Sequence, residues 1–237
     1  MKSMGIKKIV TGLTLSLLLA SGVANAADFN KGLEAAQSGD FKTALAEWTP
    51  LAEQGNSGAQ YNVGLMHDNG CGVPENDKTA VKWYTKAAEQ GNSDAQYNLG
   101  LMHDVGEGVP ENDKTAVKWY IIAAEQGYAD AQFYLGLNYE YGDGGAKDYK
   151  AAVKWYTKAA KQGNAEAQFY LGRAYEFGDG VLTNKWRAYM WYNLSTSIGY
   201  VLALNAKDYL ATQITPADIS KAQDMSSRCL ESNYTDC

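Results

Sequence analysis

The sequence predicts an all-α protein, an α/α superhelical solenoid of helical hairpins, because its dominant signal is an internal repeat of 36 residues. Within each period, two helix-length segments with periodic apolar residues flank a turn rich in glycine and proline. Tryptophan and glycine mark the period. They recur at Trp83, Trp119, Trp155 and Trp191, and at Gly55, Gly91, Gly127, Gly163 and Gly199.

Four full repeats follow one another without an insertion. They span residues 56–91, 92–127, 128–163 and 164–199. The second repeat reads NSDAQYNLGLMHDVGEGVPENDKTAVKWYIIAAEQG. One hairpin of this length cannot bury its apolar faces alone, so we expect neighbouring hairpins to stack around a continuous core.

Each repeat carries start and stop signals for two helices. The first helix is expected to begin near Ser57, with Gln60 completing a capping box. The second is expected to begin near Asp77, because a carboxylate is stabilising at the positive end of a helix. Gly91 then supplies the left-handed residue that ends it. The same signals recur in the next repeat at Ser93, Gln96, Asp113 and Gly127.

The two ends of the stack are expected to differ from the repeats inside it. Residues 27–55 predict a shorter N-terminal capping hairpin that turns at Ser38-Gly39-Asp40. Residues 200–237 predict a C-terminal capping hairpin, whose second helix opens with the N-cap Thr215 followed by Pro216. The prediction is therefore twelve helices in six hairpins.

Residues 1–26 have the pattern of a cleaved secretory signal peptide. Three lysines precede an apolar run at residues 9–19, and Ala24-Asn25-Ala26 matches a signal-peptidase site. The run is shorter than the roughly 20 residues that a membrane-spanning helix needs. We therefore expect a periplasmic or secreted protein of a Gram-negative bacterium, with no membrane insertion after cleavage.

The charge of the chain bears on its partners. The full sequence has 21 basic and 27 acidic residues; removing the leader, which holds three lysines and no acid, leaves 18 and 27, a net charge of −9. Nucleic acid requires clustered lysine and arginine, so we expect no nucleic-acid partner.

Three cysteines lie in the body of the chain. Cys229 and Cys237 are eight residues apart, and in an oxidising compartment they are a candidate disulfide, which the sequence leaves open. Cys71 is then either free or paired between molecules. The absence of CxxC and HxxxH spacings predicts no metal site.

The repeats resemble the Sel-like repeat (SLR) family, a relative of the tetratricopeptide repeat. The matching segments are AQYNLGLMH in the first helix, the G-x-GVP turn, and AVKWYTKAAEQGN in the second helix, and they cover residues 56–199 closely. The hairpin at residues 27–55 resembles the tetratricopeptide-like start of exported bacterial members, and TPADISKAQDM resembles their terminal cap.

The resemblance implies a right-handed superhelical stack and an adaptor role in protein–protein contacts. The family has no shared catalytic motif. A cysteine-rich subgroup is linked to β-lactam binding or weak hydrolysis and carries a cysteine pair in nearly every repeat. In that subgroup seven residues separate the two cysteines of a pair. This chain has such a pair only at Cys229 and Cys237.

Candidate catalytic residues do not form a known arrangement, and we expect neither a catalytic residue nor a cofactor. His67 and His103 are each followed by aspartate, but Tyr139 and Tyr175 occupy the same position in the next two repeats. A packing position explains all four, whereas a metal site explains only two. The repeated acids at the end of the first helix are expected to form a solvated ridge, at Asp68, Asp104, Glu140 and Glu176.

The first helices also carry the candidate partner-binding residues, since stacked first helices line the concave side of such solenoids. We expect Tyr61, Tyr97, Phe133 and Phe169 to belong to the core. The neighbouring positions vary in identity from repeat to repeat and are the better candidates. They are Asn62, Asn98, Tyr134, Tyr170, Leu65, Leu101, Leu137 and Arg173.

The predicted function is that of an exported, non-catalytic adaptor that holds a protein or peptide partner of the envelope in its groove. The alternative is a cell-envelope enzyme or binder that acts on β-lactams, peptidoglycan or polysaccharide.

Overall fold

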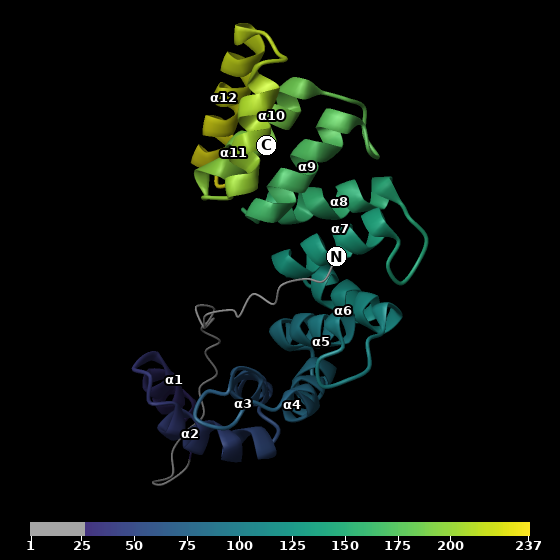
Figure 1. Cartoon of the computed structure of the whole chain (residues 1–237). Coiled ribbons are helices and arrows are strands. Elements are labelled where there is room, and N and C mark those ends of the chain that lie inside the picture. Colours follow the sequence, from purple (N-terminus) through teal and green to yellow (C-terminus); the bar gives the residue numbers. More distant parts are fainter. Residues whose placement is uncertain (1–26) are drawn as a thin grey trace. The chain divides into compact units, whose positions relative to one another are not determined.

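A computed structural model describes residues 27–237, and the predicted signal peptide lies outside these residues. The described part is entirely helical, with twelve helices and no strand, so the predicted all-α solenoid of helical hairpins is confirmed (Figure 1). The helices are α1 (Phe29–Gln37), α2 (Phe41–Glu53), α3 (Ser57–Asn69), α4 (Asp77–Glu89), α5 (Ser93–Val105), α6 (Asp113–Glu125), α7 (Ala129–Tyr141), α8 (Tyr149–Ala160), α9 (Ala165–Phe177), α10 (Lys185–Ser197), α11 (Val201–Ala211) and α12 (Pro216–Glu231).

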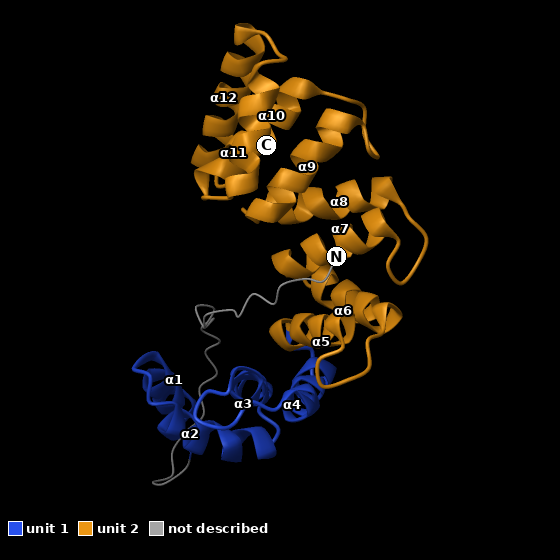
Figure 2. Ribbon diagram, viewed as in Figure 1, with its two compact units in different colours: residues 1–92 blue, residues 93–237 orange. Residues whose placement is uncertain are grey.

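The chain divides into two compact units at Asn92 (Figure 2). Unit 1 holds α1 to α4, and each helix packs on the next one along the chain. Unit 2 holds α5 to α12 and follows the same rule as far as α11. At its end, α11 and α12 both pack on α10, so the last two helices do not form a hairpin like the others.

Most predicted helix boundaries agree with the structure. Helix α3 begins at Ser57 and α4 at Asp77, and Gly91 has a φ of +90° just beyond α4. Thr215 caps α12, with Pro216 as its first residue. These local signals act within a few residues of the helix end, so they are readable from sequence.

The capping-box prediction is wrong. The side chain of Asn56 caps α3 by accepting a hydrogen bond from the amide of Ala59 at 2.8 Å. Gln60 instead donates its side-chain amide to the carbonyl of Ala52 in α2, at 3.0 Å. The helix starts one residue earlier than a capping box at Ser57 requires, and Gln60 faces the preceding hairpin instead.

The glycine-rich turn of a repeat packs against the preceding repeat. Gly144 has a φ of +73°, and a Cβ there would lie 2.9 Å from the carbonyl oxygen of Asp113, at the start of α6. Gly72 in unit 1 approaches the carbonyl of Phe41, at the start of α2, in the same way. The second glycine of the turn therefore permits a backbone contact between successive hairpins.

Candidate partner-binding face

Each of the four repeats is organised around one glycine of the first helix and one tyrosine of the second. A Cβ on the glycine would lie between 2.5 and 2.7 Å from the tyrosine ring, so the ring occupies the space that a side chain would fill. The pairs are Gly64 and Tyr84, Gly100 and Tyr120, Gly136 and Tyr156, and Gly172 and Tyr192. The two helices of a repeat thus approach each other closely through a contact between a glycine and a buried ring.

The acids at the end of the first helices are not the solvated ridge that the sequence predicts. The hydroxyl of Tyr84 donates to Asp68 at 3.0 Å, that of Tyr156 to Glu140 at 2.7 Å, and that of Tyr192 to Glu176 at 2.6 Å. A buried hydroxyl needs a hydrogen-bond partner, and these carboxylates provide it. They are structural acceptors for the tyrosine of their own hairpin.

One member of this set, Asp104, has a perturbed pKa. Burial, together with the nearby charges of Asp113, Asp143 and Glu111, raises the pKa of its carboxyl to about 6, although the Tyr120 hydroxyl opposes the shift. A carboxyl with carboxylate neighbours favours its protonated form. The charge of Asp104 is therefore sensitive to mild acidification.

The predicted partner-binding residues do not share one environment. Asn62 is only 5% exposed, so its prediction as a contact residue is wrong: its position on α3 turns into the packed interior. The other seven are half-buried. They are Asn98, Tyr134, Tyr170, Leu65, Leu101, Leu137 and Arg173. Of the four expected core positions, Tyr97 and Phe133 are buried, whereas Tyr61 and Phe169 are half-buried.

In unit 2, the aromatic residues of the first helices form one connected row of rings. The ring of Tyr134 lies 5.7 Å from Tyr97 and 5.5 Å from Phe133, and Phe133 lies 5.5 Å from Tyr170. Phe169 continues the row next to Tyr170. Tyr134 and Tyr170 thus have packed edges as well as half-exposed surface. Tyr134 and Tyr170 stand where the first two repeats have asparagine, and their rings extend the aromatic packing across α5, α7 and α9.

Arg173 replaces the leucine that the other repeats carry at its position. Its guanidinium lies 5.4 Å from the ring centre of Tyr170 and 3.9 Å from the carboxylate of Glu140, which is beyond hydrogen-bond distance. Tyr141 is a further polar neighbour. Neighbours on two helices therefore hold this half-exposed cation in place.

Sequence reasoning missed the most exposed apolar residues of this face. The last residue of each first helix in the three complete repeats of unit 2 is large and apolar: Val105, Tyr141 and Phe177, which are 47%, 47% and 62% exposed. Their spacing of 36 residues, directly before the glycine turn, was an available signal. Large exposed apolar side chains in a row are typical of interaction surfaces.

The two histidines occupy packing positions. The Nδ1 atoms of His67 and His103 are buried, and burial lowers the pKa of both side chains. Within residues 27–237, no three His, Cys, Asp or Glu side chains come together in a way that could hold a metal ion.

The structure joins Cys229, in α12, to Cys237 in a disulfide, with their Cα atoms 4.9 Å apart. Cys71 is a free, half-buried thiol in the turn after α3.

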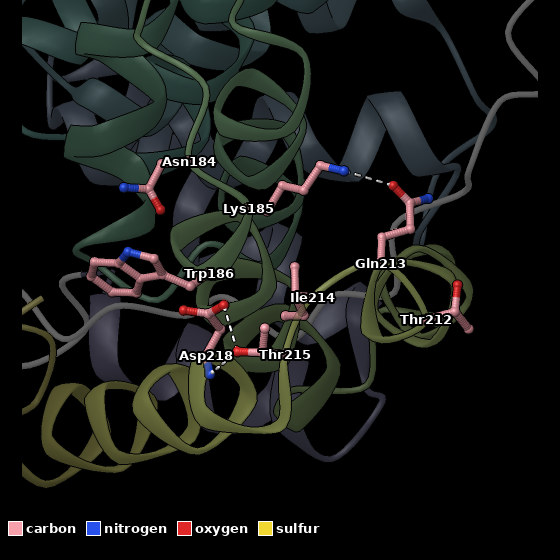
Figure 3. A pocket seen from close by; sticks show the side chains of 8 residues that line it. All are labelled: Asn184, Lys185, Trp186, Thr212, Gln213, Ile214, Thr215 and Asp218. Carbon is pink, nitrogen blue, oxygen red and sulfur yellow. Dashed lines mark hydrogen bonds between the residues drawn. The ribbon is translucent and has the colours of Figure 1, made fainter.

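An open pocket of about 610 Å³ lies at the C-terminal end of unit 2 (Figure 3). Its polar groups are paired with one another: Lys185 donates to Gln213 at 2.9 Å, and Thr215 donates to Asp218 at 2.8 Å. Its lining contains no serine, cysteine or histidine. Its lining residues are Asn184, Lys185, Trp186, Thr212, Gln213, Ile214, Thr215 and Asp218.

None of the helices in the described part of the chain is both long enough and apolar enough to cross a membrane.

Comparison with known proteins identifies the repeat. A family model described as Sel1 repeat matches four consecutive segments, residues 57–92, 93–128, 129–164 and 165–200, each one residue later than the boundaries drawn from the sequence. Among curated proteins, no sequence matches this chain.

Two solved bacterial structures show the same fold. A Sel1 repeat protein from Oxalobacter formigenes is 37% identical, with a TM-score of 0.68, over 73% of this chain and 71% of that protein. A protective antigen from uropathogenic Escherichia coli strains, described as displaying an SLR fold, is 27% identical, with a TM-score of 0.55. That match covers 89% of this chain but only 56% of the antigen, so this chain spans little more than half the antigen's length.

Proposed function

Since this chain belongs to the Sel1 repeat family, whose members are generally non-catalytic scaffolds for protein interactions, we propose that it is an exported adaptor that binds a protein or peptide partner in the bacterial envelope. The observation that carries this proposal is the row of exposed apolar residues at the ends of α5, α7 and α9, next to the half-exposed rings of Tyr134 and Tyr170. Aromatic side chains with a polar tip suit partner recognition.

The contact residues proposed within unit 2 lie on the first helices. Leu101 and Leu137 contribute apolar surface, Asn98 contributes an amide, and Tyr134, Tyr170 and Arg173 contribute polar tips on an aromatic base. Leu65 is the corresponding contact residue of unit 1. Val105, Tyr141 and Phe177 extend the same face, which we call the first-helix face.

Export to an oxidising compartment is part of the proposal. The N-terminal lysines, apolar run and Ala-x-Ala site favour secretion, and the pairing of Cys229 with Cys237 fits an oxidising environment. Cell fractionation tests this part: mature chain in the periplasm or medium supports it, and uncleaved chain in the cytoplasm contradicts it.

Affinity capture from envelope extract tests the binding role. We expect the Tyr141→Ala, Phe177→Ala double variant to lose most of the partner that the wild-type chain captures. Both side chains are exposed, Tyr141 by 47% and Phe177 by 62%, so we expect the fold to be retained, and circular dichroism checks this. Ile122→Ala, at an exposed apolar residue of the second helix α6, is the matched control. Equal losses with both variants would contradict a role of the first-helix face.

The second candidate is an envelope enzyme or binder that acts on β-lactams, peptidoglycan or polysaccharide. The pocket beside Trp186 favours the binder, because an indole among amide and hydroxyl groups can stack on a sugar ring (Figure 3). Saturable nitrocefin hydrolysis by the purified chain would establish the enzyme. Sedimentation with peptidoglycan that Trp186→Ala abolishes would establish the binder.

A further inference from the structure

We propose that the first-helix face of α7 and α9 recognises a basic segment, an extended stretch of the partner with exposed lysine or arginine side chains. This inference rests on the proposed function and specifies the chemistry of its partner. The residues that carry it are Asp130, Tyr134, Tyr141, Glu166, Tyr170 and Phe177.

These residues form one continuous surface. On α7, positions 130, 134 and 141 share a face, and on α9, positions 166, 170 and 177 repeat the same spacing. The two helices are joined through side chains, because the ring of Phe133 on α7 lies 5.5 Å from that of Tyr170 on α9. Tyr141 also interacts with Tyr170.

The charge of this surface is negative. Burial raises the pKa of the Tyr134 hydroxyl, and the charges of Asp104, Asp130 and Glu166 raise it further, which places carboxylates of three first helices near one side chain. The sequences of α5, α7 and α9 contain six acids, whereas Arg173 is their one lysine or arginine. Glu140 and two tyrosines surround Arg173 and offset its positive charge. The acids therefore dominate the charge of this face, and the face attracts cations.

The second helices α8 and α10 have the opposite charge, whereas α6 carries two lysines and two acids. Helix α8 carries Lys150, Lys154 and Lys158, all exposed, and no acid. An anionic partner is therefore favoured along α8 and disfavoured along the first helices of the same unit. This separation of charge is the argument for a basic occupant of the first-helix face.

The exposed rings supply a second means of holding a cation. A lysine or arginine can place its charged group over an aromatic face while its methylene stem packs against apolar atoms. The protein uses this contact elsewhere: Lys86 lies 4.2 Å from the ring centre of Trp83, and Lys158 lies 4.1 Å from that of Trp155. On the first-helix face, the exposed rings of Tyr141 and Phe177 offer the same surface without a lysine from α7 or α9.

The test measures the binding of two rhodamine-labelled dodecapeptides to the purified mature chain by fluorescence anisotropy. One alternates lysine and alanine, and the other alternates glutamate and alanine. We expect saturable binding of the lysine peptide alone, weakened by added salt. Glu166→Gln should raise its Kd about threefold, because an exposed ion pair contributes modestly. The Tyr141→Ala, Phe177→Ala variant should raise the Kd about tenfold.

Glu125→Gln is the matched control, since it removes the same charge from an exposed position on the second helix α6. Thermal melting of each variant shows that the fold is retained. The proposal is overturned if the lysine peptide does not bind, if the glutamate peptide binds as tightly, or if Glu125→Gln weakens binding as much as Glu166→Gln. If the chain still captures an envelope partner but does not bind the lysine peptide, this inference is contradicted and the proposed adaptor role is not.

Discussion

The contact between Gly136 and the Tyr156 ring shows how a single residue position supports a hairpin. A methyl group at Gly136 would lie 2.5 Å from the ring, while the ring's hydroxyl is held by Glu140 at 2.7 Å. The ring cannot move away without breaking that hydrogen bond. We therefore expect Gly136→Ala to lower the free energy of unfolding by about 2 kcal/mol, through overpacking, in urea titration.

Gly145→Ala is the control for this prediction. A Cβ at Gly145 meets no atom within 4 Å, and Gly145 is absent from the positive-φ glycines of the described chain. A change of similar size in the two variants would show that the contact between glycine and ring does not limit stability.

Asp104 gives a prediction of pH dependence. Its folded pKa is raised to about 6, above the value of roughly 3.9 in an unfolded chain, so the folded state binds the proton more tightly. The protonated Asp104 carboxyl therefore stabilises the folded state fully below about pH 4, and this stabilisation is lost as the pH rises through 6. Relative to Asp104→Asn, the wild type should lose about 2 kcal/mol between pH 4 and 7 in urea titrations. Parallel pH profiles of the two proteins would refute this assignment.

At the scale of the helix, a buried glutamine links successive hairpins. Gln132 on α7 donates to the carbonyl of Ala124 on α6 at 3.0 Å and accepts from Gln162, beyond α8, at 2.8 Å. Gln132→Leu leaves buried polar groups without these partners, so we expect a loss of about 2 kcal/mol in urea titration. Gln162→Ala, at an exposed residue, should cost much less. Equal losses of unfolding free energy in the two variants would show that the buried side chain of Gln132 contributes no more to stability than the exposed Gln162.

The loop closed by Cys229 and Cys237 should stabilise α12. A cross-link between residues eight apart lowers the entropy of the unfolded chain, and this model predicts a contribution of about 2–3 kcal/mol. Thermal melting with and without reductant measures it, with Cys71→Ser present in both samples to prevent exchange. An unchanged melting temperature after reduction would contradict the prediction.

The sequence predicts the elements of this fold well, and the contacts between elements less well. Helix starts at Ser57 and Asp77 follow from residues within one turn of the helix end, so the sequence reveals them. The role of Gln60 depends on a carbonyl eight residues away, in the neighbouring hairpin, and sequence spacing cannot distinguish this contact from a capping box. The packing of α12 on α10 also depends on tertiary contacts that no local signal encodes.

The candidate face was only partly predictable for the same reason. The positions of Tyr134 and Tyr170 were identified because their identity varies between repeats, but the rings that pack against them come from neighbouring helices. Asn62 shares their position in the repeat and is buried. Periodicity assigns a residue to a side of its helix, whereas burial depends on the size of the side chains on adjacent helices.

At the scale of the whole molecule, the chain is a Sel1-repeat scaffold, and we propose that its first helices bind a partner while its second helices support them. The repeated tyrosines are buried, and hydrogen bonds pair Tyr84, Tyr156 and Tyr192 with acids of their own hairpins, so these residues serve the fold. The variable positions and the exposed ends of α5, α7 and α9 are left for a partner.

Site-specific photocrosslinking in the intact bacterium tests this division most directly. A benzophenone amino acid replaces Phe177 on the first-helix face or Ile122 on a second helix, both exposed positions of unit 2. We predict a defined higher-mass adduct from position 177 after irradiation and none from position 122. Adducts from position 122 alone, or equal adducts from both positions, would contradict the claim that the first-helix face holds the partner.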